Sequence, residues 1–118
     1  IINLQLKFTV VLDPSLNKTA VLSAILSSLQ EKFNVKKLYI DQPIIVSDVV
    51  NTIFTNTGVI SVDNVQFTNI AGFVNNRQYS DITHDVKSYT KRQLVFPPTG
   101  GIFEIKYPEV DIIAKVVT

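Results

Sequence analysis

The sequence predicts an α+β domain in which two helices pack on one face of a mixed β-sheet, with a C-terminal β-hairpin. Three observations support this fold class: alternating apolar residues near both ends of the chain, an amphipathic helical pattern after the first strand, and a shorter helical pattern before another strand. The 118 residues, of which 46% are hydrophobic and 18% charged, suit a single globular domain over residues 1–118.

The first strand is predicted from Leu4 to Leu12, where apolar and polar residues alternate. A period of two is typical of a strand with one buried face, and Asp13-Pro14 ends it. A helix is then predicted over residues 17–34, with Asn17 as its cap. Its apolar side consists of Val21, Leu22, Ile25, Leu26, Leu29 and Phe33.

Lys36–Asp41 has the composition of a short strand, which the following Gln-Pro pair interrupts. A second helix is predicted over Ser47–Gly58. We expect Ser47 to cap its start, because a serine hydroxyl satisfies a free amide there. Gly58 is expected to adopt the left-handed conformation that terminates a helix.

A strand is predicted over residues 59–70, and its alternation slips near Asp63-Asn64, which indicates a bulge or a tight turn. Residues 71–93, the excursion, show neither helical nor strand periodicity. A segment of this length without a period often carries a function. Three more strands are predicted, at Leu94–Phe96, Ile102–Tyr107 and Asp111–Val117.

Pro97–Gly101, with its paired prolines and glycines, is predicted to be a turn rather than a phosphate-binding loop. A phosphate-binding loop continues into a helix that opens with Lys and Ser or Thr. Here an alternating strand follows instead. We therefore expect Ile102–Val117 to form a hairpin after this turn.

Composition argues against several function classes. The chain has no cysteine, and 11 Lys and Arg residues against 10 Asp and Glu residues give a net charge of +1, which is too even to favour nucleic acid or a membrane as the main partner. Asp81, His84 and Asp85 lie close together, but they lack a recognised metal-ligand spacing and are interpreted as a solvated loop. We predict no enzyme activity and no catalytic, cofactor or metal residue.

A protein-interaction surface is predicted near the end of the chain. Pro108 cannot donate a ladder hydrogen bond, so the β-branched segment after it is expected at a sheet edge, where another chain can add a strand. Exposed aromatics anchor interfaces, whereas Phe96 and Phe103 are expected in the core. The predicted interface residues are Tyr79, Tyr89, Tyr107, Val110 and Ile112.

Two segments resemble phage baseplate proteins. The stretch from Ala20 to Phe67 is similar to the C-terminal region of the baseplate-J family, and the closing segment resembles the end of the large baseplate wedge protein of contractile-tailed phages. The resemblance rests on Ile40, Gln42-Pro43-Ile44, Ser47-Asp48-Val49, Ile53, Gly58-Val59, Ser61-Val62, Val65, Ile102–Pro108 and Asp111-Ile112.

The resemblance implies a structural component of a tail baseplate wedge, found in the virion and assembled in the host cytoplasm. It implies a homodimer that also contacts other wedge subunits, with no cofactor, nucleic acid, membrane or small-molecule substrate. Because family members are longer and the chain does not begin with Met, we expect it to be their C-terminal fragment.

Two alternatives stay open. One is a regulatory module that binds a small ligand near Asn75, Asn76 and Arg77. The other is a weak nucleic-acid binder that uses scattered basic and tyrosine residues.

Overall fold

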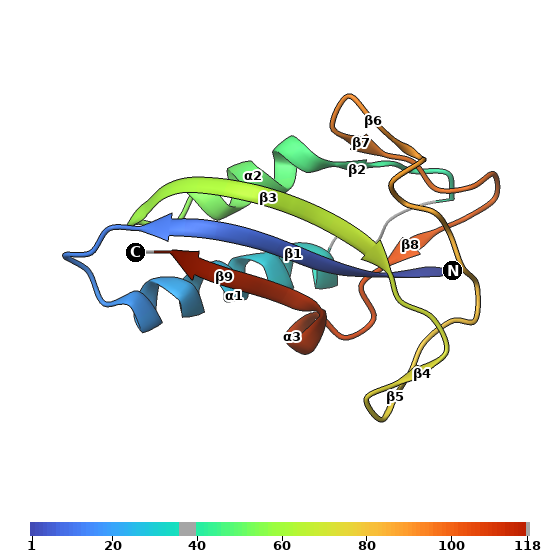
Figure 1. The fold of residues 1–118 in the computed structure, drawn as a ribbon, viewed down its shortest axis with the longest axis horizontal. Helices are drawn as coiled ribbons and strands as arrows, with labels where there is room; N and C mark the ends of the chain where they lie inside the picture. Colours follow the sequence, from blue (N-terminus) through green and yellow to red (C-terminus); the bar gives the residue numbers. More distant parts are fainter. Residues whose placement is uncertain (36–39, 118) are drawn as a thin grey trace.

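The computed structural model describes residues 1–35 and 40–117. The strand predicted over Lys36–Asp41 falls mainly outside these ranges. The fold is α+β with a mixed sheet, as predicted (Figure 1). In chain order the elements are β1 (Ile2–Leu12), α1 (Lys18–Val35), β2 (Ile44–Ile45), α2 (Val46–Phe54), β3 (Val59–Asn69), β4 (Phe73–Val74), β5 (Arg77–Gln78), β6 (Thr90–Lys91), β7 (Leu94–Val95), β8 (Phe103–Glu104), α3 (Pro108–Asp111) and β9 (Ile112–Val117).

The main sheet is built around β1. β3 pairs with one edge of β1 in the antiparallel direction, and β8 and β9 pair with the other edge in the parallel direction. Phe103 of β8 lies opposite Ile2, and Ile112 of β9 lies opposite Leu6, so the two strands follow one another along the same edge.

The predicted C-terminal hairpin is therefore wrong. Between β8 and β9 the chain leaves the sheet as the short helix α3 and then resumes in the same direction. Pro108 explains the interruption, because proline has no amide for a ladder hydrogen bond but fits the first turn of a helix.

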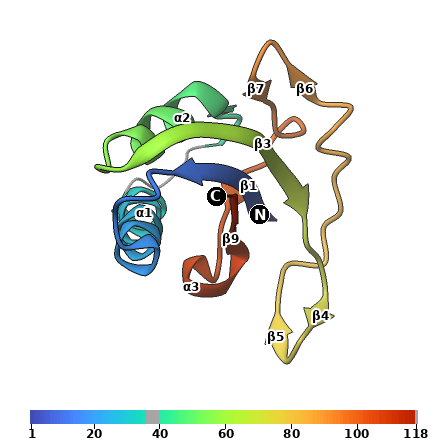
Figure 2. The ribbon, with the colours of Figure 1, turned by 60° about the vertical axis from the view of Figure 1, so that its left-hand side comes forward.

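The core lies between the sheet and the two longer helices. Alternate residues of β1 are buried, as the period of two predicts, and both helices cover that face of the sheet (Figure 2). The helices contribute their apolar stripes, which is the arrangement expected for amphipathic helices. The buried residues of these elements include Leu4, Leu6, Phe8, Val10, Val21, Ile25, Leu29, Val49 and Ile53.

The two predicted helix caps have different outcomes. The Asn17 side chain accepts a hydrogen bond from the Ala20 amide at 3.2 Å, so this cap is confirmed. Ser47 does not cap α2, because the helix begins one residue earlier, directly after β2, with Ile45 at the cap position and no side-chain hydrogen bond. Gly58 has a positive φ of 98°, but it lies beyond the end of α2, in the turn that leads into β3.

The slip in the β3 pattern is a β-bulge. Gln66 lies opposite Lys7 and Asp63 lies opposite Thr9, so two residues of β3 occupy the space opposite Phe8. Asn64, one of these two, has a φ of 55°. Asparagine tolerates this left-handed conformation better than most residues, which is why the bulge is readable from the sequence.

The excursion over residues 71–93 contains one small hairpin and the first strand of another. β4 pairs with β5 around Asn75 and Asn76, while β6 pairs with β7 around Arg92 and Gln93. β7 also pairs with β2, which forms a second sheet in the order β2-β7-β6. The strand predicted at Leu94–Phe96 is confirmed as β7, but β4, β5 and β6 are too short to produce a visible period, so the sequence pattern does not reveal them. Within the described part of the chain, the helices are not long and apolar enough to cross a membrane.

Candidate interaction surfaces

The strand β9 forms one edge of the main sheet, as the sequence predicts. It pairs with β1 from Ile112 to Val117, and among the described strands no other one pairs with it. Ile113 and Val117 are 40% and 44% exposed. An edge strand with unpaired amides and carbonyls and β-branched side chains is a template for strand addition by another chain.

The face of the main sheet opposite the helices is mostly polar. The registers place Asp63, Thr9 and Lys115 in one row across β3, β1 and β9. A neighbouring row brings Lys7 beside Ile113. This face carries positive, negative and apolar side chains side by side. It can therefore face solvent or contact a partner surface that is itself partly charged and partly apolar.

A buried hydrogen bond joins the excursion to the start of β9. The Tyr79 hydroxyl donates to the Asp111 carboxylate at 2.7 Å, and both residues are almost completely buried. The Gln5 side-chain amide approaches the other carboxylate oxygen at 3.5 Å. Burial and the hydrogen bond to Asp111 raise the pKa of Tyr79 to about 12, so its hydroxyl keeps its proton further into the alkaline range than an ordinary tyrosine does.

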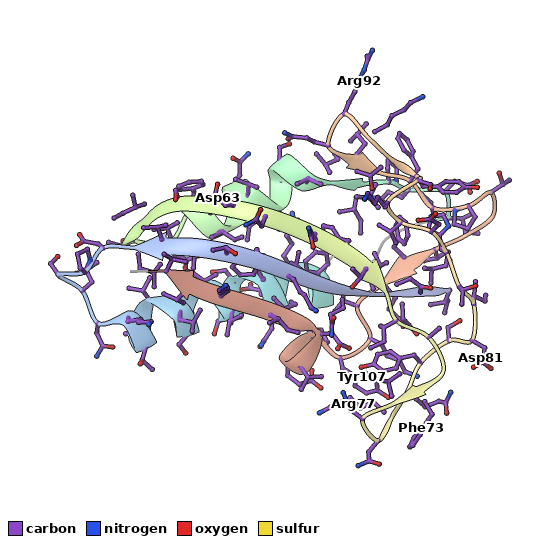
Figure 3. All side chains as sticks on the ribbon, viewed as in Figure 1. Asp63, Phe73, Arg77, Asp81, Arg92 and Tyr107 are labelled. Carbon is purple, nitrogen blue, oxygen red and sulfur yellow. The ribbon has the colours of Figure 1, made fainter. Side chains whose placement is uncertain are left out.

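Tyr107 and Lys106 extend this connection toward the β4–β5 hairpin. The Tyr107 ring packs edge-on against the Tyr79 ring, with 5.3 Å between the centroids. The Tyr107 hydroxyl and the Lys106 ammonium both donate to the Gln78 carbonyl, at 3.1 and 2.7 Å. Figure 3 places Tyr107 at the base of this projecting hairpin, beside Arg77. These contacts attach the hairpin to the body of the domain.

The five predicted interface residues fall into two groups. Tyr79 and Ile112 are only 4% and 5% exposed, so this chain itself covers both side chains and they offer almost no surface to a partner. Tyr79 is buried because Asp111 satisfies its hydroxyl, which removes the usual cost of burying a phenol. Val110 and Tyr107 are half-buried, and Tyr89 is 47% exposed.

The polar loop around His84 is organised by its own chain. A ring nitrogen of His84, Nε2, lies 2.9 Å from the Phe96 carbonyl oxygen. The Asp85 carboxylate accepts hydrogen bonds from Ser88, which hold the pKa of Asp85 below its usual value. Within residues 1–35 and 40–117, no three acidic or histidine side chains gather as a metal site would require.

Pro97–Gly101 forms the predicted turn. The Gly101 amide donates to the Pro98 carbonyl at 2.8 Å, and Gly100 has a φ of 80°, which glycine adopts without strain. The Gly100 amide also donates to the Asp41 carboxylate at 2.6 Å. The turn is thus bound to the segment before β2, and a strand rather than a helix follows it.

The small-ligand alternative gains no support from the residues on which it relied. Asn75 and Asn76 are exposed at the tip of the β4–β5 hairpin, with φ values of 48° and 63°. The Arg77 guanidinium donates to the Asn75 carbonyl at 3.4 Å. The backbone of the two asparagines forms the hairpin turn, and both residues are exposed.

The most exposed aromatic residue of the excursion is not among the five predicted interface residues. Phe73 is 68% exposed at the start of β4, where Figure 3 shows it on the projecting hairpin. The exposed residues Ile113 and Val117 are predicted only as members of the edge strand and not as individual interface residues. The pairing of strands, rather than residue type, decides which side chains face outward, so no local signal singles these residues out.

Comparisons with known proteins leave the family open. No family model matches the chain, and no curated protein sequence matches it either.

Proposed function

We propose that the chain is a structural component of a phage tail baseplate wedge that mediates subunit–subunit contacts, both in a homodimer and between wedges of the baseplate ring. The unpaired edge of β9 carries the proposal. The resemblance of the two sequence segments supplies the phage assignment. The chain then acts in the virion without catalysis, and its partners are a second copy and other wedge subunits.

The β9 edge suits a two-fold contact. Consider β9 paired with β9 of a second copy in the antiparallel direction. The faces of the two sheets that lie opposite the helices then form one continuous face only if odd-numbered residues of one strand lie opposite odd-numbered residues of the other. A register centred on Lys115 would bring two ammonium groups together. A register centred on Ala114 sets Ile113 opposite Lys115 of the second copy and avoids that repulsion, so we favour it.

The test is the oligomeric state of an edge variant. Ile113→Lys with Val117→Lys adds two cations at exposed positions of β9 and leaves its buried residues in place. Lysine on an edge strand opposes strand addition. Sedimentation equilibrium should show a dimer for the original chain, and the variant should weaken it by at least about tenfold.

The matched control is Ile60→Lys. Ile60 is exposed on β3, at the opposite edge of the sheet. This variant should associate like the original chain. A monomeric original chain, or equal association of all variants, would remove the case for the β9 edge.

A further inference from the structure

The second sheet has an inner and an outer face. The registers place Ile44 opposite Val95, and both side chains are buried. The next row consists of Ile45, Leu94 and Lys91, of which Ile45 and Lys91 are exposed and Leu94 is half-buried. Because successive residues of a strand alternate between faces, this row forms the outer face of the sheet.

Two aromatic residues extend the outer face. The Phe96 amide donates to the Tyr89 carbonyl at 3.0 Å, which continues the β6–β7 pairing beyond the strand ends. Both rings are exposed, so the prediction that Phe96 lies in the core is wrong, because Val95 and not Phe96 faces inward. His84 supports the Tyr89 ring from the domain side, with 4.4 Å between the ring centroids. The outer face thus combines aliphatic and aromatic side chains, the composition of interface anchors.

Cations border this apolar surface. Lys87, Lys91 and Arg92 are exposed; Lys87 interacts electrostatically with the Asp85 carboxylate, whereas Lys91 and Arg92 form no ion pair with a described residue. The ionised Asp85 carboxylate, which accepts a hydrogen bond from Ser88, offsets one of these three positive charges. In Figure 3 the Arg92 side chain points away from the body of the domain. The free charge on this side of the molecule is therefore positive.

The tip of the β6–β7 hairpin is held in an unfavourable backbone conformation. Arg92 and Gln93 have φ values of 50° and 62°, although neither is a glycine or an asparagine. Left-handed backbone costs an ordinary residue free energy, and two-residue hairpin turns usually place Asn-Gly there. The Val46 amide, at the start of α2, fixes the turn by donating to the Gln93 carbonyl at 2.9 Å. A turn held in this way leaves its backbone little conformational freedom to lose on binding, so the entropy cost falls mainly on the side chains.

We infer that the outer face of the β2-β7-β6 sheet is a second docking surface, and that its partner is a protein segment with apolar side chains bordered by carboxylates. The apolar side chains would cover Ile45, Leu94 and the two exposed rings. The carboxylates would meet Lys91 and Arg92. This surface is separate from β9, so the inference does not depend on the β9 contact.

The composition of the surface favours protein over single-stranded nucleic acid. Nucleic acid would use the rings for base stacking and the cations for phosphates, but it would gain little from Ile45 and Leu94. The chain's net charge of +1 also provides little of the long-range attraction on which nonspecific nucleic-acid binding depends.

The test uses fluorescence anisotropy with three labelled probes: a short peptide of alternating Glu and Leu, the same peptide with Lys in place of Glu, and oligothymidine. We expect saturable binding of the Glu–Leu peptide alone. Lys91→Glu with Arg92→Glu should weaken that binding by at least about tenfold. Neither side chain forms a hydrogen bond or an ion pair with residues 1–35 or 40–117, so the variant should unfold at the same temperature as the original chain.

Phe73→Ala is the matched control, because it removes an exposed ring from the other hairpin. It should leave the affinity for the Glu–Leu peptide unchanged. The inference is overturned if neither peptide binds, if the Lys and Glu peptides bind equally, or if the charge reversal has no effect. Tighter binding of oligothymidine than of the Glu–Leu peptide would identify the surface as a nucleic-acid site and would overturn it too.

Discussion

The Tyr79 hydroxyl and the Asp111 carboxylate form a buried hydrogen bond of 2.7 Å across 32 residues of sequence. Tyr79 follows the β4–β5 hairpin, and Asp111 is the last residue before β9. The bond therefore connects the irregular excursion to the edge strand on which the proposed assembly contact depends. A carboxylate buried at this position depends on its few hydrogen-bond donors for stability.

Tyr79→Phe should destabilise the domain by about 1–3 kcal/mol, because it leaves the buried Asp111 carboxylate without its short hydrogen bond. Urea unfolding followed by circular dichroism measures the change. Tyr89→Phe removes a hydroxyl from an exposed ring and should leave the free energy of unfolding nearly unchanged. Equal effects of the two substitutions would show that the Asp111 contact contributes nothing.

The stability of the domain should also depend on pH through Tyr79. Its pKa is raised from 10.0 to about 12, so above pH 10 the unfolded chain releases this proton while the folded chain retains it. The contribution is fully present below pH 10 and is lost as the pH rises toward 12. Urea midpoints measured from pH 9 to pH 12 should fall more steeply for the original chain than for Tyr79→Phe. Parallel curves would contradict the raised pKa.

Gln93→Gly should stabilise the domain by about 1 kcal/mol, because glycine adopts the positive φ of 62° without the steric cost that glutamine bears. Thermal and urea unfolding would measure the gain. Gln66→Gly is the control: Gln66 is exposed on β3 with ordinary strand geometry, so there glycine should destabilise by about 0.5–1 kcal/mol. Destabilisation by Gln93→Gly would show that this turn is not strained.

The sequence by itself determined the features that depend on neighbouring residues. The alternation from Leu4 to Leu12 predicts β1 and its buried face, and the helical pattern with Asn17 predicts α1 and its cap. The slip at Asp63-Asn64 predicts the bulge. Pro108 indicates the end of a strand, and it stands after β8 at the start of α3. Each of these signals is local, since backbone period, caps and bulges are set within a few residues.

Only the tertiary structure decided how the ends of the chain combine. β8 and β9 continue one another beside β1 because the pairing partners, such as Ile2 with Phe103, lie about a hundred residues apart and leave no local pattern. The same is true of Tyr79, which looks like an exposed interface residue until Asp111 meets its hydroxyl. Whether a side chain is buried or available to a partner depends on which distant segment covers it, and that is a property of packing rather than of residue type.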